Sequence, residues 1–268
     1  MFSIVVTLSA TIFYLLAAFV LARRLLGRSM DATGRMQGLL LGLAGAALHA
    51  ILLKAVIITD AGLNLSFTNT GSLATWFIAV LLLLASFKKP IENLAILVLP
   101  LSAASLLVQV LLPTTHFTTG ANAHGLGVHI LLSVLAYAML GMAAVQALLL
   151  NYQERHLHSR HPGGIIRALP PLDTMETLLV QMITIGFALH TLSLASGFVY
   201  LENMFAQHLA HKTILSIVAW TVFAILLFGR WRYGWRGRTA TRWTLSGFVT
   251  LVIAYFGSKY VLEVILNR

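Results

Sequence analysis

Eight runs of mostly apolar residues divide this chain, and each is long enough to cross a lipid bilayer as a helix. Such a helix needs about 20 apolar residues. Apolar residues make up 59% of the sequence and charged residues only 10%, against roughly 25% charged residues in soluble domains. This composition excludes an ordinary cytosolic enzyme, a disordered tail and a nucleic-acid-binding module. We therefore predict an all-α, polytopic membrane bundle that forms a single transmembrane domain over residues 1–268, with eight transmembrane helices at 2–22, 36–58, 71–87, 92–112, 126–150, 177–199, 212–229 and 243–264.

The lysine and arginine residues predict how these helices are oriented. Fourteen of the 18 follow the first, third, fifth and seventh helices, and the other four lie at or near the opposite side: Lys54, Lys212, Lys259 and Arg268. Cytoplasmic loops carry an excess of Lys and Arg, so this distribution places both termini on the periplasmic side of a bacterial inner membrane. The same rule explains the net charge of +10 without a nucleic-acid partner.

Histidine is the ionisable residue that the predicted helices place inside the membrane. No Asp or Glu lies at mid-span, which disfavours a proton- or sodium-coupled carrier, and the absence of cysteine excludes a thiolate metal site. His49, His129 and His190 all fall in the outer half of their predicted helices. Small residues share their helix faces, such as Gly45 beside His49 and Gly186 beside His190. These faces allow close helix packing and would equally make room for a flat ligand.

Neutral imidazole is a good ligand for haem iron, and histidines on two helices can clamp the ring from both sides. We therefore take His129, His49 and His190 as candidate haem-binding residues, with His129 and His49 as the axial pair. Trp76, near the outer end of the third helix, is a candidate to flank the ligand. The simpler interpretation of any one of these histidines is a packed side chain that is hydrogen-bonded to a neighbouring carbonyl. A zinc site is disfavoured because the sequence has no HExxH motif or paired His/Asp set.

Cations near the outer surface would hold the haem propionates. The candidates are Lys54, Lys212 and Lys259, although lysines at such positions more often extend to the membrane surface. On the cytoplasmic side, the aromatic residues within Arg230–Arg238 are typical of an interfacial belt beside positive charge rather than of a binding site.

Several motifs resemble a known family. The stretch Gly127-Val-His129-Ile-Leu-Leu-Ser-Val-Leu-Ala-Tyr137-Ala is similar to the histidine-bearing helix of the CcsA/CcmC-type cytochrome c assembly superfamily, whose members handle haem. Four further stretches resemble its YpjD-like branch: Asn64–Ser72, Lys212–Trp220, Gly234-Trp-Arg-Gly-Arg238 and Ala254-Tyr-Phe-Gly-Ser-Lys259. The resemblance covers nearly the whole chain.

This resemblance implies a haem site open to the periplasm, where two histidines flank a Trp-rich outer loop. His129 matches the first flanking histidine. The outer segment 200–211 contains no tryptophan, and Ser258-Lys259 stands where the second histidine is expected. The family's haem-presenting site is therefore incomplete in this chain, and the resemblance implies b-type haem bound by His129 with another membrane histidine. His49 is the first choice and His190 the second.

The function predicted from these features is the binding or handling of haem, without catalysis of a defined reaction. The expected partners are haem, the lipid bilayer and other cytochrome c biogenesis or membrane proteins. One alternative is a non-haem accessory or transporter-associated subunit that keeps the fold and has lost the site. Another is an enzyme acting on a lipid or quinone, which no paired carboxylates and no nucleophile with an adjacent base support.

Overall fold

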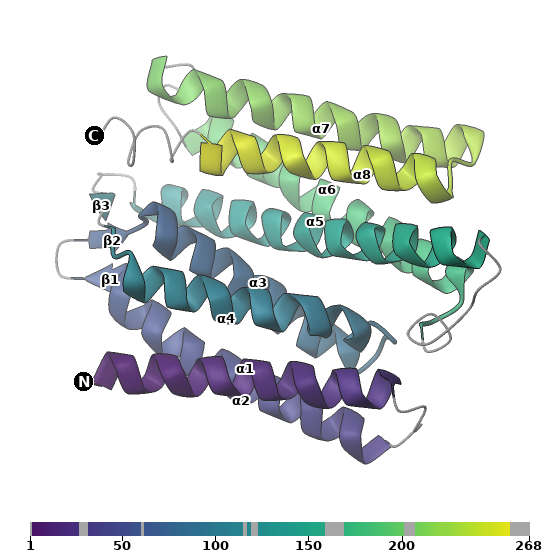
Figure 1. The fold of residues 1–268 in the computed structure, drawn as a ribbon. Coiled ribbons are helices and arrows are strands. Elements are labelled where there is room, and N and C mark those ends of the chain that lie inside the picture. Colours follow the sequence, from purple (N-terminus) through teal and green to yellow (C-terminus); the bar gives the residue numbers. More distant parts are fainter. Residues whose placement is uncertain are drawn as a thin grey trace. The chain divides into compact units, whose positions relative to one another are not determined.

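The computed structural model describes residues 2–26, 32–59, 62–114, 117–118, 123–158, 169–200 and 207–257, and these are almost entirely α-helical (Figure 1). The helices are α1 (Phe2–Leu26), α2 (Ala32–Ile57), α3 (Phe67–Ser86), α4 (Ala95–Leu111), α5 (Ala123–His158), α6 (Leu172–Tyr200), α7 (Gln207–Tyr233) and α8 (Gly237–Val252). Within the described residues, seven helices are long and apolar enough to cross a membrane, and they fall in α1 to α7. The prediction of an all-α, multi-pass membrane protein is confirmed.

The eighth predicted span differs from the structure. The sequence predicts it at 243–264, whereas α8 starts at Gly237, covers 16 residues and continues as a π-helical turn, Ile253–Gly257, where the described chain ends. By length and composition, α8 is not among the seven candidate spans of the described residues, so the predicted count of eight spans is not confirmed. The early start follows from the tight connection between α7 and α8.

The chain divides into two compact units. The N-terminal unit comprises residues 1–119 and 156–170, and the C-terminal unit comprises residues 120–155 and 171–268. The first contains α1 to α4 and the last three residues of α5, and the second contains the rest of α5 with α6 to α8. His49 lies in the first unit, and His129 and His190 lie in the second.

The N-terminal unit contains a small β-sheet and a row of hydrogen bonds between the polar side chains of α3 and α4. Strands β1 (Ile58–Thr59), β2 (Gly62–Asn64) and β3 (Phe117–Thr118) form an antiparallel sheet in that order. Gly62 adopts φ 113° at the start of β2, a conformation that favours glycine. Along α3 and α4, Asn69 Oδ1 accepts a 3.0 Å bond from Gln109 Nε2, and the hydroxyls of Thr75 and Ser105 lie 2.6 Å apart. These hydrogen bonds satisfy polar groups for which the lipid tails offer no hydrogen-bond partner.

In the C-terminal unit, glycines allow the helices to approach closely. A Cβ on Gly186 would lie 2.7 Å from the side chain of Leu140, and a Cβ on Gly247 would lie 2.8 Å from the ring of Phe223. Leu140 and Phe223 are both fully buried. The small residue that the sequence places beside His190 therefore serves helix packing.

The connection between α7 and α8 explains the Gly234–Arg238 motif. Gly234 and Gly237 have φ values of 68° and 53°, which a residue with a side chain adopts at a cost. The backbone N–H of Gly237 donates to Glu176 Oε1 of α6 at 3.0 Å, and Arg230 Nη1 donates to the carbonyl of Trp235 at 3.0 Å. The turn is therefore tied to a neighbouring helix, and α8 begins immediately after it.

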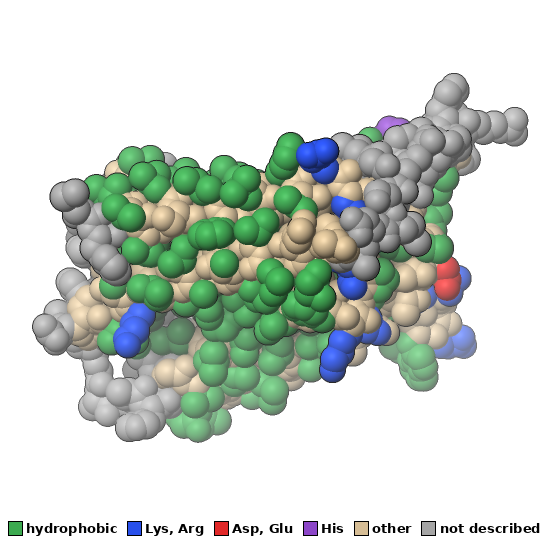
Figure 2. Space-filling model, turned by 90° about the horizontal axis from the view of Figure 1, so that it is seen from below, with side chains coloured by type: hydrophobic (Ala, Val, Ile, Leu, Met, Phe, Trp, Pro, Cys, Tyr) green, Lys and Arg blue, Asp and Glu red, His purple; other side chains and the backbone are tan. Residues whose placement is uncertain are grey.

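The outer surface of the helices is apolar, as a lipid-facing surface requires. Figure 2 shows green hydrophobic side chains spread over the flanks of the helices and blue Lys and Arg side chains near the helix ends. At the end of α7, Trp231 is 81% exposed and Tyr233 is 68% exposed, with Arg232 stacked on the Tyr233 ring at 5.8 Å. Exposed aromatic residues beside arginines at a helix end are the arrangement expected of an interfacial belt.

Candidate functional site

His129 of α5 is oriented by two serines of α6. Its Nδ1 atom lies 3.0 Å from the carbonyl oxygen of Ser193 and 3.1 Å from Ser196 Oγ. A carbonyl oxygen only accepts, so Nδ1 carries the proton and donates it. Nε2 is then an unprotonated nitrogen, and no described residue bonds to it. The ring is only partly buried, so this nitrogen is prepared to act as a ligand.

Ser133 strengthens the same contact one turn further along α5. Its hydroxyl lies 2.7 Å from Ser193 Oγ and also donates to the carbonyl of His129 at 2.7 Å. The α5–α6 interface next to the histidine is therefore held by hydroxyls as well as by apolar packing, and the ring of His129 is kept in one orientation.

His190 of α6 repeats the arrangement toward α7. Its Nε2 atom lies 3.1 Å from the carbonyl oxygen of Ser216, so Nε2 is the protonated nitrogen. The residue is 3% exposed, and its Nδ1 atom is buried with no hydrogen-bond partner in the described part of the chain. A buried acceptor without a partner is costly in a native structure. His190 thus offers a second unprotonated nitrogen in the same unit as His129.

Tyr137 lies further along α5 than His129 and contacts the end of α8. The Tyr137 hydroxyl donates to the carbonyl of Leu251 at 3.2 Å, and its ring meets the Tyr255 ring edge-on at 5.9 Å. Tyr255 belongs to the π-helical turn, and Lys212 Nζ lies 5.9 Å above its ring. Single π-turns often occur at functional sites. Lys212, one of the predicted propionate partners, is therefore positioned over an aromatic ring.

His49 has a different environment in the N-terminal unit. Its Nδ1 atom lies 3.2 Å from the Tyr14 hydroxyl and its Nε2 atom lies 2.8 Å from Ser72 Oγ. The side chain is fully buried, and Tyr14 packs against it edge-on. Both ring nitrogens of His49 are thus already engaged, and the residue joins α1, α2 and α3.

Trp76 supports the same junction. Its indole N–H donates to the carbonyl of Ala46 at 2.8 Å, and its ring meets Phe77 edge-on. Ala46 and His49 are one turn apart on α2, as Ser72 and Trp76 are on α3. The indole N–H that would face a ligand is therefore used to hold α3 against α2, although Trp76 itself stays partly exposed.

The remaining predicted residues are dispersed. Lys259 lies outside the described residues, and Lys54 is exposed at the end of α2. Another histidine of the sequence, His211, is exposed near the start of α7. Among the described side chains, no three His, Asp or Glu residues gather as a metal cluster. Sequence reasoning missed Tyr14 and Ser196, whose only sequence signal is their position on the same helix faces as the small residues.

Comparisons with known proteins agree with the motifs of the sequence. Residues 36–266 match the family described as Cytochrome C assembly protein. The chain is 36% identical over 223 residues to the inner membrane protein YpjD of Escherichia coli (strain K12), and the aligned region covers 81% of this chain and 83% of that protein. It is 37% identical over 150 residues to an uncharacterized 28.8 kDa protein in the nifR3-like 5' region of Azospirillum brasilense, covering 55% of each.

A more distant relative has an assigned role. The cytochrome c biogenesis protein CcsA of Gloeothece citriformis is 29% identical over 98 residues, which is 36% of this chain and 30% of that protein. No solved structure matches the chain. The resemblance inferred from the motifs is confirmed, and the protein is a multi-pass protein of the inner membrane. The chain belongs to the cytochrome c assembly protein family.

Proposed function

We propose that the protein binds haem in its C-terminal unit, with His129 as an axial ligand and His190 as the second candidate. One observation carries this proposal: each histidine donates one ring N–H to a backbone carbonyl of a neighbouring helix and keeps its other nitrogen without a described partner. Metal-binding histidines are commonly held in this way, since the bond at one nitrogen orients the ring and makes the other more basic. Bound haem would supply an iron centre that accepts such neutral nitrogens.

His49 fits the role of a ligand less well. To offer either ring nitrogen to iron, it would first have to release Tyr14 or Ser72. The pairing of His129 with His49 therefore stays a prediction, and the surroundings of His190 favour that residue as the partner of His129. Lys212 and Lys259 remain predicted contacts of the haem propionates. Trp76 lies in the N-terminal unit, where its indole N–H is bonded to Ala46, so it is not part of this proposed site.

The proposed role is to hold or present a b-type haem for cytochrome c assembly, together with other membrane proteins of that process. The distant likeness to CcsA, which is named for cytochrome c biogenesis, supports this role. No covalent step is assigned to the side chains of the C-terminal unit. What they supply is ligation, and the serines of α6 supply the orientation of His129.

The visible spectrum of the purified protein tests haem binding. Wild-type protein, oxidised and then reduced with dithionite, should show a Soret band and sharp α/β bands after expression with added haem. His129→Ala should lose or shift these bands, His190→Ala should shift them, and His49→Ala should leave them in place where the protein folds. His211→Ala is the matched control because that histidine is exposed. A colourless wild-type protein would overturn the proposal.

We also propose the complete topology: eight spans, the last formed by α8 with the residues that follow it, and both termini on the periplasmic side. The sequence contains no cysteine, so single cysteines can report the side of each position. In spheroplasts, a membrane-impermeant maleimide should label Lys54→Cys and Arg268→Cys, and should label Lys88→Cys only after lysis. Labelling of position 268 only after lysis would refute the eight-span topology.

A further inference from the structure

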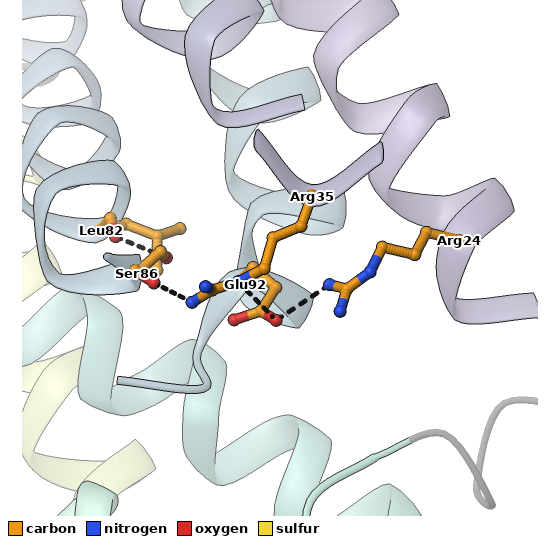
Figure 3. Close-up of polar contacts among 5 residues, drawn as sticks. All are labelled: Arg24, Arg35, Leu82, Ser86 and Glu92. Carbon is orange, nitrogen blue, oxygen red and sulfur yellow. Dashed lines mark hydrogen bonds and ion pairs between the residues drawn. The ribbon is translucent and has the colours of Figure 1, made fainter. Parts of the chain in front are cut away.

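Two arginines and one glutamate form a partly buried cluster at one end of the N-terminal unit. Figure 3 shows Arg24 and Arg35 pointing toward Glu92. Arg24 Nη1 and Arg35 Nε donate to the same carboxylate oxygen, Oε1, at 3.1 and 3.2 Å. Arg35 also donates to the carbonyl of Ser86, at the end of α3. The cluster therefore joins α1, α2, α3 and the 3-10 helix η1 (Glu92–Leu94).

The polar atoms of this cluster are not balanced. Two guanidinium groups share one oxygen, so the cluster carries one positive charge in excess. The Nε atom of Arg24 and the Oε2 atom of Glu92 are buried and have no partner among the described residues. The same holds for Nδ2 of the next residue, Asn93, which is 7% exposed. Buried polar atoms, and charged ones above all, are normally satisfied. The cluster and the adjacent Asn93 thus have two unused donor nitrogens and one unused carboxylate oxygen.

The cluster lies at the level where the apolar spans end. Arg24 stands next to the last residue of the span Ser3–Leu25, and Glu92 is the first residue of the span Glu92–Leu111. Phospholipid headgroups occupy this level of a bilayer, and basic pockets between membrane helices bind lipid phosphates there. Arg24 and Glu92 keep 22% and 19% of their side-chain surface exposed. Because their unpartnered atoms are themselves buried, a headgroup would reach those atoms when the two side chains turn toward this exposed surface.

We propose that this cluster binds the headgroup of phosphatidylethanolamine. The phosphate oxygens accept hydrogen bonds from Arg24 Nε and the Asn93 amide, and the excess positive charge of the two arginines offsets the phosphate. The ammonium donates to Glu92 Oε2. A choline headgroup carries the same charge but has no N–H to donate, a glycerol headgroup has no cation, and free inorganic phosphate has neither the ammonium nor the acyl chains.

Native mass spectrometry of the full-length protein tests this inference. The protein is released from nanodiscs that contain equal parts of the ethanolamine, choline and glycerol phospholipids. It should retain the ethanolamine lipid about tenfold more than the choline lipid, because the choline headgroup cannot form the charge-assisted hydrogen bond to Glu92. Equal retention of the two would overturn the proposal. Displacement of the lipid by inorganic phosphate would also overturn it, because it would identify free phosphate as the ligand.

Matched variants locate the site. Arg24→Gln should abolish the preference for ethanolamine lipid, whereas Arg23→Gln, which removes the same charge from the neighbouring exposed residue, should preserve it. Glu92→Gln should reverse the preference toward the anionic glycerol lipid, because the arginines lose their carboxylate. Asp173→Asn, at an 81% exposed carboxylate of α6, is its control. An unchanged preference in Arg24→Gln would refute the site.

The proposal can still be tested if a variant fails to fold, because the lipid headgroup can be altered instead of the protein. Ethanolamine lipids with one, two and three N-methyl groups keep the positive charge and lose their N–H donors stepwise. Retention by the wild-type protein should fall most sharply at the third methyl group, where the last donor disappears. A retention that does not change along this series would contradict the proposed bond to Glu92. The test is independent of haem, so either proposal can fail alone.

Discussion

Replacing His49 with alanine should destabilise the N-terminal unit substantially, because this side chain joins three helices. The mutation leaves the hydroxyls of Tyr14 and Ser72 without a partner. Hydrogen bonds between membrane helices contribute about 0.6 kcal/mol on average and up to about 1.7 kcal/mol each. The imidazole is fully buried, so its removal also leaves a cavity worth about 2 kcal/mol or more. The expected loss is therefore roughly 3–5 kcal/mol of unfolding free energy.

Unfolding in mixed detergent micelles with increasing dodecyl sulfate measures this loss, with circular dichroism as the signal. A double-mutant cycle separates the hydrogen bond from the cavity. Tyr14→Phe should cost about 1 kcal/mol in the wild-type background and almost nothing in the His49→Ala background, since the bond is already absent there. His211→Ala, at an exposed position, should leave the unfolding curve unchanged.

Two results would refute this reasoning. His49→Ala within about 0.5 kcal/mol of the wild type, the range typical of surface substitutions, would mean that the histidine does not join the helices. An equal cost of Tyr14→Phe in both backgrounds would mean that the two side chains are not coupled. A stable His49→Ala protein that also lost its haem spectrum would identify His49 as a ligand.

Three further predictions use the same unfolding assay. Gly186→Ala should lower the free energy of unfolding by about 1–2 kcal/mol, because the added methyl group overpacks against Leu140. Leu140→Ala should cost less in the Gly186→Ala background than in the wild type, and additive losses would exclude a clash between the two side chains. Gly234→Ala should destabilise the protein by about 1 kcal/mol from its positive φ alone, because a Cβ there would meet no other atom. Gly34 also has open space around it but lies in a helix, so Gly34→Ala should stabilise the protein by about 0.5–1 kcal/mol. Equal effects of the two mutations would exclude backbone strain at Gly234. Glu176→Gln should cost about 1–3 kcal/mol, and an unchanged midpoint would show that the α7–α8 turn does not depend on its charge.

The motifs on which the family resemblance rests also hold the fold together. Within Asn64–Ser72, Asn69 bonds both Gln109 and the carbonyl of Asn64, and Ser72 bonds His49. Within Gly234–Arg238, two positive φ values and the bond to Glu176 define a tight turn. A sequence motif marks residues that cannot be exchanged freely, but it does not separate a role in packing from a role in binding.

The three histidines show where sequence reasoning stops. Hydropathy placed His49, His129 and His190 at a similar depth, and on depth alone His49 was the preferred partner of His129. The structure distinguishes them by their neighbours: His49 has both nitrogens engaged, while His129 and His190 each have one engaged by a backbone carbonyl. That difference depends on which residues of other helices meet the ring, and spacing along one helix carries no such information.

The sequence by itself determined the membrane class of the protein, most of its spans and its family, because hydropathy, charge distribution and motif spacing are local properties of the chain. Only the tertiary structure decided which nitrogen of each histidine is unprotonated, which carboxylate serves two arginines and where α8 begins. The physical reason is that a hydrogen bond is a short-range contact between groups that are often distant in sequence. His129 and Ser193 are 64 residues apart in the chain, and their bond is 3.0 Å long.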